Sequence, residues 1–101
     1  MVEKRQLVYL YCIANKEPKI NGLGNDLYSI CNNGLYAVAS KVNKEEFGQE
    51  GLKRNMADFE WIKTRASLHE KIIERVMDNI NVIPFKFATL FNTDDSLSLN
   101  N

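Results

Sequence analysis

The single histidine, His69, precedes Glu70, and this pair could open the HExxH motif, in which two histidines on one helix face bind zinc. The second histidine would stand at position 73, which is an isoleucine. His69 also falls on an apolar stripe with helical spacing, which favours a hydrogen-bonded core histidine. The sequence therefore predicts no metal site around His69.

Other chemically capable residues do not form a recognisable set. Gly22-Leu23-Gly24 lacks the third glycine of a dinucleotide fingerprint, and a strand rather than a helix is expected after it. No serine or cysteine has a free histidine to activate it. The carboxylates Glu45, Glu46 and Glu50 cluster at an expected helix start, where they complement the helix dipole. We expect no catalytic residue, no metal and no cofactor.

Length and charge exclude several classes of protein. The 101 residues suffice for one domain, and 13 basic residues balance 13 acidic ones. A nucleic-acid-binding protein would normally carry a basic excess. The longest apolar run, residues 7–14, is far shorter than the roughly 20 residues of a membrane-spanning helix. Cys12 and Cys31 lack CxxC spacing, and we expect both to be reduced and buried.

Four segments have the composition of strands, at residues 5–14, 26–31, 34–42 and 82–91. The first is apolar at every position, which is typical of a central strand that is covered on both faces. Asn32-Asn33-Gly34 predicts a tight hairpin turn between the second and third strands. Pro84 lacks an N–H group, which predicts either that the last strand lies at an edge of the sheet or that Pro84 stands at the start of that strand.

A short helix is expected after Asn43, with Glu46 reaching back as in a capping box, and Gly48 and Gly51 should shorten or break it. A long helix is expected from about 56 to 79, capped by Asn55. Its apolar stripe comprises Phe59, Ile62, Ala66, His69, Ile73, Val76 and Ile80. We expect this stripe to cover the sheet.

The order of strand, strand, strand, long helix, strand predicts an α+β fold. It corresponds to a modified ferredoxin-like fold, in which a four-stranded, mainly antiparallel sheet has helices packed on one face and a loop replaces the first helix. A meander of the first three strands is the alternative, and the sequence does not decide between the two.

Helices on one face leave the other face of an apolar sheet uncovered, and such a patch marks an interaction surface. Alternation along the strands places Phe85 and Phe87 toward the helices and the smaller, even-numbered residues on the other side. The candidate partner-binding residues are therefore Val8, Leu10, Cys12, Ala88 and Leu90.

Several short motifs taken together resemble the gas vesicle protein F/L family. They are Tyr9-Leu10-Tyr11, Ala37-Val38-Ala39-Ser40, Asp58 with Glu60-Trp61, His69-Glu70, and the run 82–89, which reads VIPFKFAT. The resemblance spans about residues 7 to 97. Phe59, Lys86 and Ala88 stand where Leu, Arg and Gly are common in the family.

This resemblance implies a non-enzymatic accessory or minor structural protein of gas vesicles, cytoplasmic and acting in vesicle assembly through contact with the main shell protein and other vesicle proteins. Residues 1–101 correspond to the family's N-terminal domain, and the C-terminal domain of the family is absent from this sequence. In a full-length protein that domain would be a further partner.

Two other functions fit the same fold. Ferredoxin-like sheets often bind small regulatory ligands between protomers. Tyr9, Tyr11 and Tyr36 faintly resemble the stacking aromatics of RNA-binding sheets, although Asn33-Gly34-Leu35 departs from that pattern and the net charge is zero.

Overall fold

A computed structural model of the chain describes residues 6–20, 22, 26–78 and 80–92. Four strands, β1 (Gln6–Ala14), β2 (Leu27–Asn32), β3 (Leu35–Asn43) and β4 (Val82–Asn92), form one sheet in the order β2-β3-β1-β4. All neighbouring strands are antiparallel. This confirms the predicted α+β, ferredoxin-like arrangement and shows that the alternative meander is wrong.

The hairpin between β2 and β3 turns as the sequence predicts. Asn33 and Gly34 both have positive φ angles, 54° and 81°, as a two-residue type I′ turn requires. The turn directs β3 back between β2 and β1, so β1 lies inside the sheet with β3 on one side and β4 on the other. Residues 7–12 of β1 are all buried, which confirms the prediction of a doubly covered central strand.

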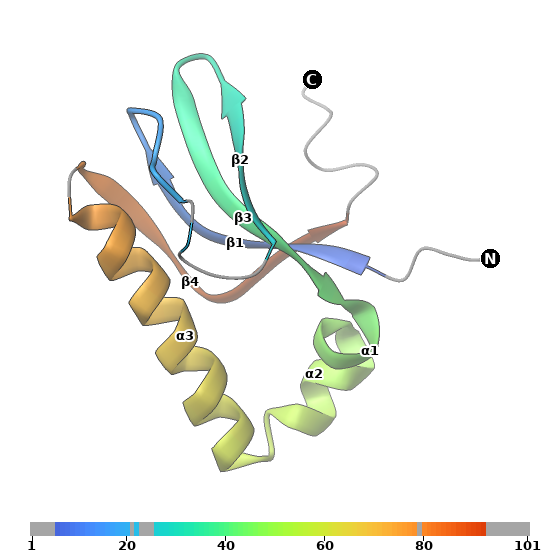
Figure 1. The fold of residues 1–101 in the computed structure, drawn as a ribbon. Coiled ribbons are helices and arrows are strands. Elements are labelled where there is room, and N and C mark those ends of the chain that lie inside the picture. The colour runs from blue at the N-terminus through green and yellow to red at the C-terminus, as the bar shows by residue number, and fades with distance from the viewer. Residues whose placement is uncertain (1–5, 21, 23–25, 79, 93–101) are drawn as a thin grey trace.

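Three helices, α1 (Lys44–Phe47), α2 (Gln49–Asn55) and α3 (Phe59–Met77), lie on the same side of the sheet (Figure 1). Asn43 caps α1 by accepting a hydrogen bond from the Glu45 N–H. Gly48 separates α1 from α2, as predicted. Gly51 permits a close approach, because a Cβ atom there would lie 2.1 Å from the Glu45 carbonyl oxygen.

The start of the long helix differs from the prediction. Asp58, rather than Asn55, is the N-cap of α3 and accepts hydrogen bonds from the N–H groups of Glu60 and Trp61. The Asn55 amide instead donates to the Glu46 carbonyl oxygen at 3.0 Å, which satisfies the end of α1. Phe59 consequently opens the helix and is 72% exposed, so its predicted place on the buried stripe is wrong.

Glu46 ties α1 to α3. Its Oε2 atom accepts hydrogen bonds from Trp61 Nε1 at 2.6 Å and from Arg65 Nε at 2.8 Å. Glu46 therefore does not reach back to the Asn43 backbone as a capping box would, because its carboxylate is used across the helix pair. This half-buried contact sets the position of α1 beside the long helix.

The main core lies between the helices and the sheet. Helix residues Phe47, Ile72, Ile73 and Val76 pack there against buried residues of β1 and β3, with Trp61, Phe87 and Leu90 at the margin. Pairs of aromatic rings, such as Tyr9 with Phe47 at 5.5 Å and Trp61 with Phe87 at 6.2 Å, fill the space under α3. The long helix is thus the main cover of the sheet.

Ile73 provides a test of this packing. Ile73→Ala should lower the free energy of unfolding by about 2–5 kcal/mol, because it leaves a cavity in a well-packed core. Phe59→Ala, at an exposed position of the same helix, should change it by less than about 0.5 kcal/mol. Urea unfolding of both variants measures the difference, and equal effects would contradict the observed helix register.

Candidate interaction face and the polar network behind it

The sheet face opposite the helices is apolar across all four strands. Val8, Leu10 and Ala39 are buried at its centre, with Tyr28, Ile30, Ala37, Phe85 and Phe91 packed around them. Ile13 pairs with both Ala37 and Ile83, so these residues share that face. We call this set, together with Leu35, the open face.

Its margins expose apolar side chains to solvent. Ile83 on β4 is 71% exposed, and Leu35 at the start of β3 is 49% exposed. Lys41 pairs with Val8, and the register therefore places its charged side chain on the open face. It is the one charged residue of the described strands that the pairing places there. A large apolar area with so little charge is the composition expected of an interaction surface.

The five candidate residues separate onto the two sides of the sheet. Val8 and Leu10 lie on the open face as predicted, although both are 3% exposed and thus form its floor. The predicted face is wrong for Cys12, which is fully buried in the helix-side core, and for Leu90, which packs against that core. Ala88 belongs to a bulge, described next, and its N–H bonds to a helix-side hydroxyl.

A bulge explains the wrong assignment of Cys12. Leu90 pairs with Tyr9 and therefore lies on the helix side; its assignment is wrong because the bulkier, odd-numbered side chains of β4 are not, as a set, the ones that face the helices. The pairing of β1 with β4 jumps from Leu10–Thr89 to Cys12–Pro84, so Tyr11 alone stands opposite residues 85–88. A bulge breaks strict alternation and re-aims the following side chains. Tyr11 and Cys12 therefore both join the helix-side core. The same irregularity directs Phe87 toward the helices and Phe85 toward the open face, contrary to the prediction that they share a side.

Two buried side chains supply the hydrogen bonds that this bulge needs. The Ala88 N–H donates to Tyr9 Oη at 3.0 Å, and Tyr9 Oη lies 2.9 Å from His69 Nδ1. His69 Nε2 lies 2.9 Å from the Phe85 carbonyl oxygen. A carbonyl can only accept, so Nε2 carries the proton and Nδ1 accepts from the tyrosine. We call these four residues the bulge network.

The Tyr9 hydroxyl, the two His69 ring nitrogens, the Ala88 N–H and the Phe85 carbonyl each have a partner of the correct kind, which buried polar groups require. His69 Nε2 donates its proton to the Phe85 carbonyl and the Nδ1 lone pair accepts from Tyr9, so the ring has no free lone pair for a metal or a substrate proton. Burial also raises the pKa of Tyr9 to about 12, with the hydrogen bond from Ala88 acting in the opposite direction. Tyr9 therefore stays protonated and continues to donate.

The sequence signals for this network were present but ambiguous. His69 on an apolar stripe correctly indicated a hydrogen-bonded core histidine. Its partners, however, come from strands that are distant in the chain, so the sequence could not identify them.

Burial raises the pKa of the Cys12 thiol to about 11, so this thiol is not activated. Both cysteines are free, but Cys31 is exposed, contrary to the prediction.

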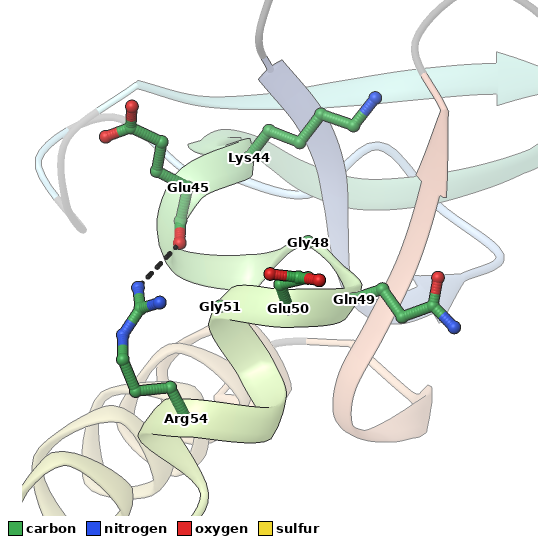
Figure 2. Close-up of a pocket in the computed structure, with 7 residues that line it drawn as sticks. All are labelled: Lys44, Glu45, Gly48, Gln49, Glu50, Gly51 and Arg54. Carbon is green, nitrogen blue, oxygen red and sulfur yellow. Dashed lines mark hydrogen bonds between the residues drawn. The ribbon is translucent and has the colours of Figure 1, made fainter.

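A hollow lies at the junction of α1 and α2 (Figure 2). Its lining mixes charges of both signs, and the Arg54 guanidinium already donates to the Glu45 carbonyl oxygen at 3.3 Å. Gly48 and Gly51 form its floor through the close approach of the two short helices. The hollow therefore follows from helix packing and presents no convergent binding groups.

Within the described ranges, no three His, Cys, Asp or Glu side chains are grouped so that they could hold a metal ion. Across those same residues, no helix combines the length and the apolar character needed to cross a membrane.

The bulge network makes a prediction about alkaline stability. The Tyr9 hydroxyl ionises near pH 10 in the unfolded chain and near pH 12 in the folded one. The free energy of unfolding should therefore lose this contribution between pH 10 and pH 12. Tyr9→Phe should cost about 1–3 kcal/mol at pH 7, because the Ala88 N–H and His69 Nδ1 lose their partner.

Urea unfolding at a series of pH values tests this. Above pH 10 the free energy of unfolding should fall less steeply in Tyr9→Phe than in the unmodified chain. The fall that remains in the variant comes from the ionisation of other buried tyrosines. An identical decline in both proteins would show that Tyr9 does not hold its proton as described.

Ala88 offers an independent test of the bulge. Its φ of 67° lies in the left-handed region, which costs an alanine about 1–2 kcal/mol. Ala88→Gly should relieve this strain and raise the free energy of unfolding by about 0.5–1 kcal/mol, after the greater flexibility of the unfolded chain is subtracted. Ala88→Val should lower it, because a β-branched residue tolerates this conformation poorly. Thermal unfolding of the pair measures both signs, and a destabilising glycine would contradict the observed backbone.

The family motifs now have a structural meaning. Residues 82–89 form the first part of β4 and its bulge, and His69 fixes that bulge from α3. A family model described as gas vesicle synthesis protein GvpL/GvpF matches residues 7–99. No curated protein and no solved structure matches the chain. The match covers nearly all of the sequence, including the helices and strands described above except for the first residue of β1, and the chain therefore belongs to the GvpL/GvpF family of gas vesicle synthesis proteins.

Proposed function

We propose that this gas vesicle protein is a non-enzymatic accessory or minor structural protein, and that it acts in vesicle assembly by contacting the main shell protein through its open face. The observation that carries the proposal is an apolar sheet face that no described helix covers, on a chain of this family. A soluble monomer seldom leaves so continuous an apolar area without a partner.

The chemistry of the open face indicates the kind of contact. Ile83, Leu35 and the half-buried rings of Phe85 and Phe91 form the accessible part, over a floor of Val8 and Leu10. Burial of apolar surface would drive binding, with about 25 cal/mol gained per Å². Binding should therefore depend weakly on salt, unlike contacts made by charged surfaces.

A non-enzymatic role agrees with the state of the chemically capable residues. Both ring nitrogens of His69 are hydrogen-bonded inside the core, and Cys12 is buried with a raised pKa. General acid–base catalysis needs a group that can reach a substrate proton, and these groups cannot. His69 therefore serves as a structural residue in this proposal.

The competing functions receive less support. Tyr9 and Tyr11, the aromatics that could have stacked on RNA bases, are 2% and 6% exposed and face the helices. The hollow beside α1 and α2 lacks the convergent polar groups of a small-molecule site.

The proposal also includes the place of the chain in its family. Residues 1–101 would form one domain equivalent to the family's N-terminal domain, located in the cytoplasm at the gas vesicle. In a longer form of the protein, a C-terminal domain would be a second candidate occupant of the open face.

Capture of the main shell protein tests the contact. Ile83→Lys places a charge at an exposed position of the open face and should reduce capture about tenfold or more, since a lysine must lose water on binding. Phe59→Lys is the matched control, because Phe59 is 72% exposed but lies on the helix side. It should leave capture unchanged.

Circular dichroism should show the same folded spectrum for both variants. Equal capture by the two variants and the unmodified chain would contradict the assignment of the open face. Failure of the unmodified chain to capture the shell protein would instead contradict the choice of partner. A strong loss of capture with added salt would exclude a mainly apolar contact.

A further inference from the structure

The two outer strands of the sheet differ in how they discourage pairing with another chain. β4, at one edge, carries Pro84, which has no N–H, the exposed Lys86, and a bulge at Ala88. Proline, lysine and bulges are the features by which natural proteins protect an exposed strand edge. The β4 edge is therefore poorly suited to accept a further strand.

β2, at the other edge, has none of these features (Figure 1). Its sequence, LYSICN, contains no proline and no charged residue, and its pairing with β3 runs from Leu27 to Asn32 without a register shift. Residues 27–30 are half-buried, while Cys31 and Asn32 are exposed. A regular, uncharged edge is a template for strand addition.

The hairpin turn determines which backbone groups of β2 face outward. In a two-residue turn the flanking residues, Asn32 and Leu35, form a hydrogen-bonded pair. Hydrogen-bonded and non-hydrogen-bonded pairs then alternate along the hairpin. The N–H and C=O groups of Leu27, Ser29 and Cys31 consequently point away from β3, toward the edge.

We propose that a second copy of this chain adds to the β2 edge, with the two β2 strands antiparallel and a two-fold axis at Ser29. In this register Ser29 pairs with Ser29 of the second copy, and Leu27 pairs with Cys31 in both directions. All the outward groups are then matched, and each of these pairs exchanges two N–H···O bonds.

The side chains agree with this register. Tyr28 and Ile30 lie on the open face, and Tyr28 of each copy stands opposite Ile30 of the other. Pairs of an aromatic with a β-branched residue across antiparallel strands are stabilising. Because the two-fold axis is perpendicular to the sheet, the open faces of both copies lie on the same side and form one continuous apolar surface.

A second copy is the occupant that the residues favour. β2 carries no charge, so self-pairing brings no like charges together. The protected β4 edge prevents β2 of one copy from pairing with β4 of the next, an arrangement that would grow into a filament. Two strands of this length bury a small area, so the dimer should be weak and depend on concentration.

Sedimentation velocity over a range of protein concentrations tests the dimer. The average mass of the unmodified chain should rise from that of a monomer toward that of a dimer. Ser29→Pro removes the central outward N–H and should raise the dissociation constant about tenfold or more. Ile83→Lys, on the open face but at the opposite edge, is the control and should dimerise normally.

Tyr28→Lys gives a second test if the proline variant fails to fold. It should also weaken the dimer, because two lysines would replace the pairs of Tyr28 with Ile30. Circular dichroism verifies folding in each case. A chain that stays monomeric at its highest soluble concentration, or a dimer that both β2 variants leave intact, would overturn the proposal.

Disulfide formation tests the register. Hydrogen-bonded partners in an antiparallel pair have Cα atoms about 5.5 Å apart, within the range of a disulfide. Ser29→Cys, introduced together with Cys31→Ser, should therefore form covalent dimers under mild oxidation. In the unmodified chain the Cα atoms of the two Cys31 residues would be roughly 14 Å apart and should not crosslink across the interface.

The reverse pattern, with crosslinking through Cys31 and none through Ser29→Cys, would overturn the register centred on Ser29. Neither measurement uses a shell protein, so failure of the dimer leaves the proposed contact with the vesicle shell to its own test. Association with an added uncharged peptide but not with a second copy would show that the edge accepts a different strand and would overturn the dimer.

Discussion

The structure depends on satisfying the backbone of a bulge inside the protein. Residues 85–88 of β4 cannot pair with β1, because a single residue of β1 stands opposite them. An unpaired buried N–H or C=O group costs about 1–3 kcal/mol. Tyr9 and His69 remove this cost by binding the Ala88 N–H and the Phe85 carbonyl, and each also binds the other. One tyrosine and one histidine thereby join β1, α3 and β4.

The same bulge creates the surface on which the proposed function rests. Without it, Phe85 and Phe87 would be separated by a regular pleat and lie on one side of the sheet. With it, Phe87 enters the core beneath α3, beside Trp61 and Tyr9, and Phe85 is directed to the open face. The core thus keeps one ring to fill the space beneath the helix, while the open face gains another. The bulge also disrupts the β4 edge, which leaves β2 as the regular edge of the sheet.

Local patterns in the sequence predicted the elements well but not the sides that residues occupy. The all-apolar first strand, the Asn33-Gly34 turn and the 19-residue helix α3 each result from interactions among neighbours in the chain. The face of Cys12 depends instead on a bulge, and the face of Leu90 depends on its pairing with the remote residue Tyr9. Asn55 and Asp58 both suit an N-cap, and the contact between Asn55 and Glu46 decided between them.

Two residues of the motifs that support the family resemblance, His69 and Ala88, have a geometric role in the bulge. His69 occurs there because a ring with one donor and one acceptor can bridge a tyrosine hydroxyl and a carbonyl. The glycine that the family resemblance leads one to expect at position 88 would suit the left-handed backbone at that point, where Ala88 accepts the strain. Both residues therefore suit the shape of the bulge, and the bulge directs Phe85 to the open face. His69, which sequence alone could connect with zinc or with proton transfer, is thus held between a tyrosine hydroxyl and a backbone carbonyl inside the fold.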